Sequence, residues 1–371
     1  MHPDAIDAEG RVPHGGEPDH SLLDFSANTN PRTPEGVESV YADALESARR
    51  YPDDGYPTFL DAAGTYVGCD PSAVVPTPGG LAAIRLAFEA TLDPGGLAVV
   101  PHPSFGEYAR EVRLQGARPR FVPHEAVCDL AVESLRDVDL VVVCTPNNPT
   151  GDLPDRSRLE GLADRCRTAG TTLLVDEAFL GFTEQESMAR REDDCVVVAR
   201  SLTKLFGLPG LRAGFAVAFG SLGECLEMAR RTWNLGSPAA AVGAYCMGQT
   251  AFVSDTRERV TEERERMREA LLADGRYAVA PSNAPFLLLE VGGDGGGGGA
   301  VSSVDGDGEA ASSVDRDGGA TDPVDDLLER TREAGVVIRD ARSFRGLDSH
   351  VRVAVRDRRA NDRLLEVLVD G

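Results

Sequence analysis

The sequence predicts an α/β fold: a mainly parallel sheet wrapped by helices, with a smaller α+β domain beside it. Three observations support this prediction. Between about residues 55 and 220, short Val- and Leu-rich runs alternate with helical patterns, an order typical of parallel strands joined by crossover helices. Continuous apolar runs such as Leu140–Val143 suit strands that helices cover on both faces. After residue 250 the order changes to one long helix followed by shorter strands and helices.

The large part of the chain is predicted to alternate between strands and helices. The predicted strands are Leu97–Pro101, Pro119–Val122, Leu140–Cys144, Thr172–Asp176, Cys195–Arg200 and Ala213–Ala218. The predicted helices are Gly80–Ala90, Gly106–Leu114, Asp155–Thr168 and Leu222–Arg231. These elements predict a large domain over residues 51–250, preceded by an N-terminal arm over residues 1–50 that also forms part of the small domain.

Residues 251–371 are predicted to form the C-terminal small domain. A long solvated helix over Val253–Asp274 leads into it, because Glu and Arg recur there at helical spacing. Its further predicted elements are the strands Tyr277–Ala280, Phe286–Val291, Val336–Arg339 and Val351–Val355, a helix over Pro323–Ala334 and a closing helix from about Arg359. The Gly-, Ser- and Asp-rich insertion at residues 292–321 buries too little apolar surface to offset its chain entropy, so we expect a disordered loop without a catalytic role.

The charge of the chain excludes some classes of partner. The sequence has 61 Asp and Glu against 38 Lys and Arg, a formal net charge of -23. Such a surface repels nucleic acid and anionic lipid, so neither is an expected partner. Only one of the basic residues, Lys204, is a lysine. An acidic, lysine-poor composition is typical of halophilic organisms such as salt-loving archaea.

The cysteines and the N-terminus indicate the cellular setting. None of the seven cysteines forms a CxxC pair, so we expect free thiols in a reducing cytoplasm and no metal site. The first residues lack the basic and apolar regions of a secretory signal, and no apolar run is long enough to span a bilayer. The sequence therefore predicts a soluble, cytoplasmic protein.

The strongest functional signal is the run from Ser201 to Gly214, which contains Lys204 between hydroxyl residues and a Gly-Pro-Gly-like turn. Arginine replaces lysine everywhere else, yet its guanidinium stays protonated and is a poor nucleophile. A desolvated lysine amine can attack a carbonyl carbon near neutral pH. A surface lysine would have no reason to survive this replacement, so Lys204 is predicted to be catalytic.

The same run resembles the active-site motif of the fold-type I pyridoxal-phosphate (PLP) enzymes, the aspartate aminotransferase superfamily. The resemblance implies a fold-type I PLP-dependent transferase fold, with residues 51–250 as the PLP-binding domain. It also implies that Lys204 binds the cofactor covalently, and that Ser201, Thr203 and Arg212 hold the cofactor phosphate.

Two further motifs follow predicted strands. Asp176 ends the strand Thr172–Asp176, at the strand end where α/β folds bind ligands. A carboxylate there can keep the pyridine nitrogen protonated, although capping of a helix is the alternative. The motif Thr145–Gly151 resembles the superfamily's Asn-Asn-Pro-Thr-Gly turn, which implies that Asn148 binds the ring 3-oxygen.

Two weaker motifs complete the predicted cofactor site. The amides of Gly80 and Leu81 open a helix after a Gly-rich turn, which suits a phosphate. The superfamily usually has Asn-Gly-x-x-Glu here, so Pro78 and Ala82 depart from its pattern. Phe105 aligns with the aromatic residue that stacks on the cofactor ring, with core packing as the alternative.

The terminal segments resemble a particular subfamily, the threonine-phosphate decarboxylases of cobalamin biosynthesis. The resemblance rests on His14-Gly15-Gly16, Leu22–Pro31, Asp176–Phe179, Arg200–Lys204, Ile338-Arg339 and Gly346–Arg356. Phe179 stands where histidinol-phosphate aminotransferases usually have tyrosine. The resemblance extends over the whole chain except the insertion at residues 292–321.

The subfamily resemblance implies decarboxylation of L-threonine O-3-phosphate to (R)-1-aminopropan-2-ol O-2-phosphate, the source of the aminopropanol linker of cobalamin. This small phosphorylated substrate would bind to His14, Gly15, Asn28 and Asn148 of the N-terminal and large domains. Arg339 and Arg352, on neighbouring predicted strands, suit its anionic groups, with surface salt bridges as the alternative.

The resemblance also implies a homodimer with shared active sites, in which Tyr51 reaches the cofactor phosphate of the partner subunit. The alternative activity is that of a histidinol-phosphate or related amino-acid aminotransferase. A PLP-sensing regulatory protein is a further alternative, but the sequence shows no basic DNA-binding segment.

Overall fold

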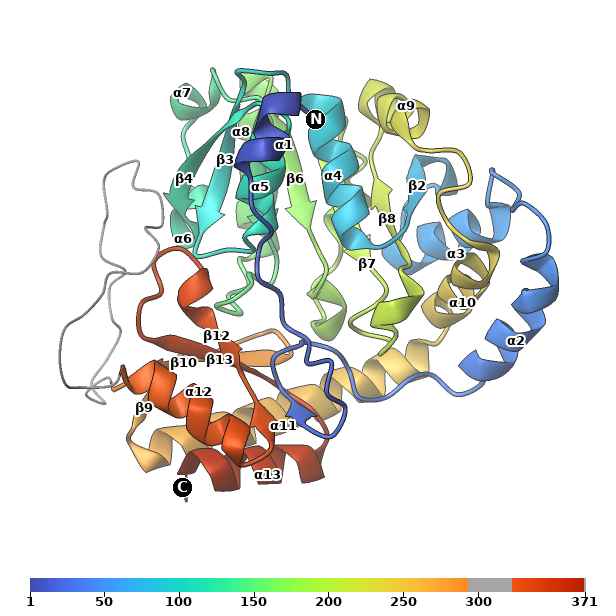
Figure 1. Cartoon of the computed structure of the whole chain (residues 1–371). Helices are drawn as coiled ribbons and strands as arrows, with labels where there is room; N and C mark the ends of the chain where they lie inside the picture. Colours follow the sequence, from blue (N-terminus) through green and yellow to red (C-terminus); the bar gives the residue numbers. More distant parts are fainter. Residues whose placement is uncertain (293–321, 370–371) are drawn as a thin grey trace.

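The computed structural model describes residues 1–292 and 322–369, so the insertion predicted at residues 292–321 lies, after Gly292, outside the described residues. A seven-stranded sheet forms the centre of the large domain, in the order β2-β8-β7-β6-β5-β3-β4 (Figure 1). Its strands are β2 (Val74–Thr77), β3 (Leu97–His102), β4 (Arg118–Pro123), β5 (Leu140–Cys144), β6 (Thr172–Asp176), β7 (Val196–Ser201) and β8 (Gly214–Val217). Only β8 runs against the others, so the predicted mainly parallel sheet is confirmed.

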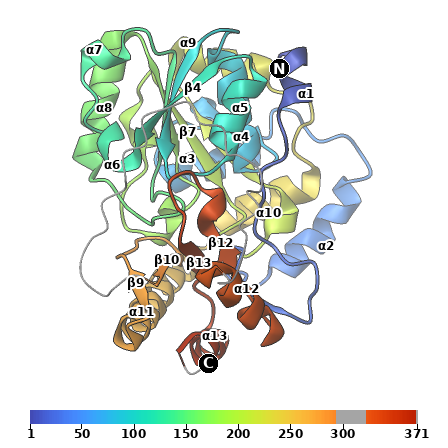
Figure 2. The same cartoon turned by 60° about the vertical axis from the view of Figure 1, so that its left-hand side comes forward.

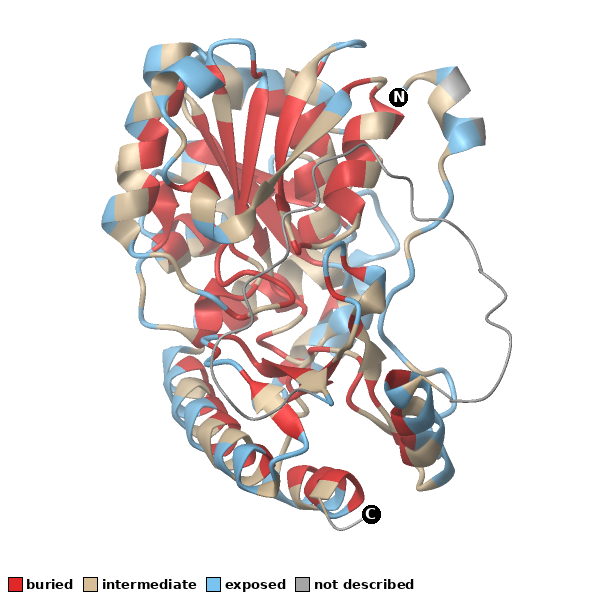
Figure 3. Cartoon of the chain, turned by 90° about the vertical axis from the view of Figure 1, so that its left-hand side faces the viewer, coloured by how far each residue is buried: buried red, intermediate tan, exposed pale blue. Residues whose placement is uncertain are grey.

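Helices cover both faces of this sheet because its strands are apolar on both faces. Val141 and Val143 pack into one buried cluster, with α3 (Pro57–Val67), α8 (Arg156–Ala169) and α10 (Ser237–Met247). Leu140 and Val142 point to the opposite cluster, with α4 (Gly80–Thr91), α5 (Glu107–Leu114) and α9 (Gly220–Ala229). Successive side chains of a strand alternate between faces, which explains the continuous apolar run in the sequence. Figure 3 shows the sheet as the buried centre of this part of the molecule.

The small domain lies at the carboxyl ends of the large sheet's parallel strands (Figures 1 and 2). Its antiparallel sheet has the order β12-β13-β10-β9, and its strands are β9 (Tyr277–Val279), β10 (Phe286–Val291), β12 (Arg339–Asp340) and β13 (His350–Ala354). The helices α11 (Thr250–Asp274), α12 (Pro323–Glu333) and α13 (Arg358–Val369) accompany this sheet. From the N-terminal region, β1 (Leu23–Asp24) pairs in parallel with β11 (Val336–Val337).

The structure corrects several sequence-based elements. The single strand predicted over Val336–Arg339 is wrong: it is divided into β11, which pairs with β1, and β12, which pairs with β13. A strand with no break at Ile338 cannot serve two separate sheets. Strand β2 and three helices were not predicted: α2 (Val37–Ser47), α3 and α10. The short helices α1 (Pro3–Ala8), α6 (His124–Val127) and α7 (Val132–Leu135) complete the described helices.

Candidate active site

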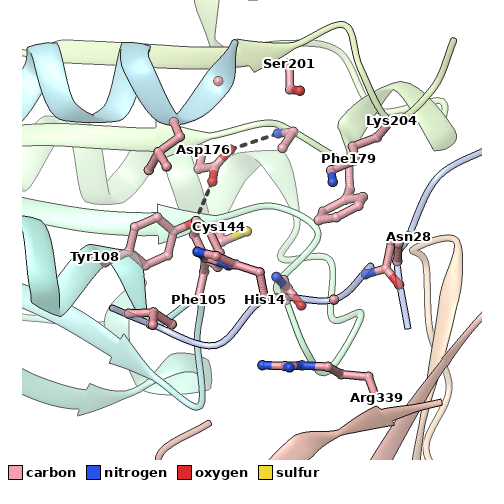
Figure 4. A pocket seen from close by; sticks show the side chains of 18 of the residues that line it. His14, Asn28, Phe105, Tyr108, Cys144, Asp176, Phe179, Ser201, Lys204 and Arg339 are labelled. Atoms are coloured by element: carbon pink, nitrogen blue, oxygen red, sulfur yellow. Dashed lines mark hydrogen bonds between the residues drawn. The ribbon is translucent and has the colours of Figure 1, made fainter. Parts of the chain in front are cut away.

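A cavity of about 310 Å³ lies where the parallel strands end and the small domain begins. Strands β5, β6 and β7 end at Cys144, Asp176 and Ser201, and all three residues line it (Figure 4). The predicted site residues that line the cavity are His14, Gly15, Asn28, Gly80, Leu81, Phe105, Asn148, Asp176, Ser201, Thr203, Lys204, Arg212, Arg339 and Arg352. The fold thus brings together every predicted site residue except Tyr51.

Lys204 lies in the turn after β7 and is partly exposed to the cavity. Its carbonyl oxygen accepts a hydrogen bond of 3.0 Å from the amide of Asn30, which joins this turn to the N-terminal region. Burial lowers the pKa of the Lys204 amine to about 8, and the positive charges of Arg352 and Arg212 act in the same direction. About a tenth of the amine is therefore uncharged, and hence nucleophilic, at pH 7, far more than for an ordinary lysine.

Asp176 is a buried carboxylate at the end of β6. The hydroxyl of Tyr108 donates to its Oδ2 at 2.5 Å, and the amide of Ala178 donates to its Oδ1 at 3.0 Å. Burial raises the pKa of Asp176, while these two hydrogen bonds oppose the rise. Tyr108 itself is fully buried, so its hydroxyl is held on the carboxylate.

The first turn of α4 faces Ser201, Thr203 and Arg212. Gly79 has a φ of 96°, and a side chain there would lie 2.7 Å from the Arg212 guanidinium. A side chain at Gly80 would lie 3.0 Å from Cβ of Ser201. The Ser201 and Thr203 hydroxyls are 2.8 Å apart. Amides at a helix start, two hydroxyls and a guanidinium form a cradle suited to a phosphate.

Asn148 and Arg352 face each other from the large and the small domain. Arg352 donates through Nη1 to the Asn148 side-chain oxygen, and through Nη2 to the Ser26 carbonyl oxygen at 3.1 Å. Its Nε is buried without a hydrogen-bond partner among the described residues. Burial, with Arg339 nearby, lowers the pKa of Arg352 to about 9.

Arg339 is the direct cross-strand neighbour of Arg352, so the predicted adjacency of these arginines is confirmed. It donates to the Pro13 carbonyl oxygen at 2.8 Å and to Ser343 Oγ at 2.9 Å. Within the described residues, no salt bridge is found at Arg339, Arg352 or Arg212. In so acidic a chain, three arginines at one cavity without carboxylate partners favour anionic ligands.

The N-terminal segment closes one side of the cavity. His14 Nε2 lies 2.9 Å from Glu107 Oε1, and the His14 ring is tilted against Phe105 with a centroid distance of 5.7 Å. A side chain at Gly15 would approach the Ser26 carbonyl oxygen to 2.1 Å, so only glycine fits there. The buried Asn28 has a side-chain oxygen without a partner among the described residues.

Tyr51 lies away from the cavity of its own chain. Its side chain is 77% exposed and stacks on Trp233, with ring centroids 4.1 Å apart. An exposed aromatic residue is compatible with a contribution to a partner subunit, which stays a prediction.

Sequence reasoning missed the residues that support the site from behind. Tyr108, the partner of Asp176, lies in the first turn of α5, three residues after the predicted site residue Phe105, and this nearness in sequence is the one signal that pointed to it. Glu107, the partner of His14, and the buried Arg200–Glu177 ion pair at 3.0 Å were not predicted either. Only the pairing across the fold shows what these side chains contact.

The cavity fits the predicted cofactor. A nucleophilic amine, a buried carboxylate and a phosphate cradle are the three groups that an aldehyde-bearing pyridine phosphate requires. The side-chain oxygen of Asn28 is buried there without a partner in the described chain. The glycines of the α4 turn leave the space that a phosphate needs.

Comparison with known proteins agrees with this geometry. The family described as "Aminotransferase class I and II" matches residues 19–368. The chain belongs to this family. It is 32% identical to the threonine-phosphate decarboxylase of Salmonella typhimurium over 368 residues, covering 95% of this chain and 92% of the relative. It is 28% identical to histidinol-phosphate aminotransferase 2 of Archaeoglobus fulgidus over 355 residues, covering 95% of this chain and 93% of the relative.

The fold is also that of solved class I and II aminotransferases. The structure of histidinol-phosphate aminotransferase from Sinorhizobium meliloti in complex with pyridoxal-5'-phosphate matches with a TM-score of 0.81 and 16% identity. The match covers all of this chain and 96% of that one. This class I and II aminotransferase-family chain is an enzyme with the fold-type I architecture, and its cofactor is pyridoxal 5'-phosphate.

Two features are absent from the described residues. No described helix is both long and apolar enough to cross a membrane. Nor does that part of the chain contain a cluster of His, Cys, Asp and Glu suited to a metal ion.

Proposed function

We propose that this enzyme decarboxylates L-threonine O-3-phosphate to (R)-1-aminopropan-2-ol O-2-phosphate, the precursor of the aminopropanol linker of cobalamin. The observation that carries the proposal is that Arg339 and Arg352 are cross-strand neighbours at the cavity. Neither forms a salt bridge with a carboxylate of the described chain. A substrate with a carboxylate and a phosphate supplies the anions that two such guanidinium groups require. The 32% identity to a threonine-phosphate decarboxylase supports the same substrate.

Each residue has a physical task in the proposed reaction. When bound, pyridoxal 5'-phosphate draws the electrons of a broken Cα bond into its ring. Asp176 holds a proton at the pyridine nitrogen, and Tyr108 fixes the orientation of that carboxylate. Lys204 would hold the cofactor before the substrate arrives, and its ammonium form would then donate a proton to the substrate Cα in place of the carbon dioxide that leaves.

The outcome depends on which Cα substituent stands perpendicular to the cofactor ring. Decarboxylation requires the carboxylate in that position, whereas transamination requires the hydrogen. In the proposal, Arg352, Arg339 and His14 bind the substrate's anionic groups and thereby set its orientation. Ser201, Thr203, Arg212 and the α4 turn bind the cofactor phosphate.

We further propose that the enzyme acts as a homodimer in the cytoplasm and that Tyr51 completes the partner's site. The exposed stack of Tyr51 on Trp233 supports this, since two large exposed aromatic rings are common at protein interfaces. Determination of the molecular mass in solution, for the wild type and for Tyr51→Phe and Tyr51→Ala, tests the homodimer. The contribution of Tyr51 to the partner's site predicts that the affinity for the cofactor falls in Tyr51→Ala.

Histidinol-phosphate aminotransferase is the second candidate, because the 28% identical relative is matched over an equal share of the chain. The two are separated by incubating the cofactor-loaded enzyme with O-phospho-L-threonine and no keto acid. A decarboxylase releases carbon dioxide over many turnovers. An aminotransferase stops after one half-reaction and resumes when 2-oxoglutarate is added.

Arg352→Ala tests the substrate site within the same assay. Loss of a buried guanidinium should weaken binding of the transition state by roughly 2–5 kcal/mol. This loss is measured as a lower kcat/KM for phosphothreonine. Arg345→Ala is the control, because Arg345 is exposed, stacks on Phe121 and does not line the cavity. If carbon dioxide never forms and histidinol phosphate with 2-oxoglutarate sustains turnover, the decarboxylase proposal is wrong.

A further inference from the structure

The segment Gly10–Gly16, here called the N-terminal strap, crosses the cavity edge and is attached on three sides. Arg110 Nε of α5 donates to the Gly10 carbonyl oxygen at 2.8 Å. Arg339 of the small domain donates to the Pro13 carbonyl oxygen at 2.8 Å. The Gly16 amide donates to Ser26 Oγ at 2.8 Å. The strap therefore has a defined position between the two domains, and His14 lies at its centre.

Glu107 connects the strap to the start of α5. Its side chain is only 6% exposed, whereas that of His14 is 49% exposed. Glu107 Oε1 lies 2.9 Å from His14 Nε2, and Oε2 accepts from Arg110 Nη1 at 3.1 Å. Next to it, Gly106 lies against Val12, where a side chain would approach to 2.8 Å. The buried carboxylate is thus held by Arg110 and offers its other oxygen to the imidazole.

This contact decides what His14 can offer to a ligand. A carboxylate accepts but does not donate, so His14 Nε2 must carry the proton of their hydrogen bond. The other ring nitrogen, Nδ1, remains for a ligand, and a protonated imidazole donates from both nitrogens. Figure 4 shows His14 on the side of the cavity where Arg339 lies. An anion bound by these residues would accept from the Arg339 guanidinium and, through Nδ1, from the protonated form of the His14 ring.

We propose that Glu107 is a positioning residue that holds His14 for the phosphate monoester of the substrate and so sets the preference for phosphorylated substrates. The inference rests on the proposed function for its substrate class. Threonine phosphate and histidinol phosphate both carry such a monoester, so the inference is independent of which reaction follows. Glu107 acts through His14 and does not touch the reacting atoms.

The test compares Glu107→Gln with Glu111→Gln in the cofactor-loaded enzyme. Glutamine keeps the size of Glu107 but replaces one carboxylate oxygen with an amide nitrogen and removes the negative charge beside the imidazole. Glu111 is a control, because it is also buried and lies one turn further along α5. It pairs with Arg85 at 2.6 Å and shares Arg110 with Glu107, at 3.6 Å, but does not contact His14, so it isolates the effect of the His14 contact. Rapid mixing, which records binding through the change in cofactor absorbance before turnover, gives the Kd of O-phospho-L-threonine and of L-threonine, and steady-state kinetics give kcat and KM.

Glu107→Gln should raise the Kd and the KM for O-phospho-L-threonine about tenfold, as expected for loss of a charge-assisted contact at a half-exposed group. It should change kcat by less than about twofold and leave the Kd of L-threonine unchanged. Glu111→Gln should lower the melting temperature without a selective effect on phosphothreonine. In a His14→Ala background, Glu107→Gln should have no further effect on the Kd.

Three results would overturn the inference. One is an unchanged Kd for phosphothreonine in Glu107→Gln. Another is an equal loss in the His14→Ala background, and the third is a parallel weakening of L-threonine binding, which would indicate a structural role. If the wild-type enzyme binds neither phosphothreonine nor histidinol phosphate, the proposed function fails, and the inference fails with it.

Discussion

Replacing Arg200 by methionine should destabilise the enzyme, because the change leaves a buried carboxylate without its cation. Arg200 Nη1 donates to Glu177 Oε2 at 3.0 Å, and both side chains are almost fully buried. The guanidinium also lies 5.2 Å from the centroid of the Tyr66 ring. The pair joins the residue after Asp176 to the residue before Ser201, so it fixes the ends of β6 and β7 under the cavity.

The size of the effect follows from what remains around Glu177. Removing one partner of a buried ion pair costs about 3–5 kcal/mol. The Ser187 hydroxyl and the Met188 amide still donate to the carboxylate, each at 2.7 Å. We therefore expect the lower end of that range, about 3 kcal/mol of unfolding free energy. Urea unfolding at constant salt concentration measures it.

Two comparisons make this prediction refutable. The exposed Arg49–Glu46 pair spans 3.6 Å on the surface, so Arg49→Met should cost less than about 0.5 kcal/mol. The double variant Arg200→Met/Glu177→Gln should be more stable than Arg200→Met alone, because it contains no buried unpaired charge. The reasoning is wrong if Arg200→Met costs no more than Arg49→Met, or if the second substitution destabilises further.

Three other predictions concern the cofactor, the site and the surface. Burial lowers the pKa of Lys204 to about 8, so the ammonium form prevails below that pH. The rate at which the cofactor-free enzyme binds PLP covalently should therefore increase as the pH rises through 8. Borohydride should then label residue 204 alone; a pH-independent rate, or a label retained in Lys204→Arg, would contradict this. Tyr108→Phe should raise the pKa of Asp176 further, because the lost hydrogen bond opposes the effect of burial, and should lower kcat by about tenfold or more with little change in KM. With a net charge of -23, the melting temperature should rise as potassium chloride increases from millimolar to molar, and a flat profile would refute this effect of self-repulsion.

The sequence by itself determined the fold class and the groups of the cofactor site. Runs such as Leu140–Cys144 and Thr172–Asp176 are buried on both faces, so their composition alone identified them, and their observed bounds agree. Lys204 was identifiable because it is the only lysine, and Asp176 because it ends a strand. Of the elements that were missed, β2 is short and α10 has a weak helical pattern, whereas α2 and α3 are as long as other predicted helices and have as clear an amphipathic pattern as α4.

Only the tertiary structure decided which side chains act on one another. Tyr108 and Asp176 are 68 residues apart, His14 and Glu107 are 93 apart, and Asn148 and Arg352 are 204 apart. A residue's own chemistry and its local periodicity are encoded nearby in the chain, so they can be inferred from a single sequence. The partner of a buried charge depends on how the strand ends, the N-terminal strap and the small domain pack together. Desolvation in that packed cavity, which no local spacing encodes, is what lowers the pKa of Lys204 and raises that of Asp176.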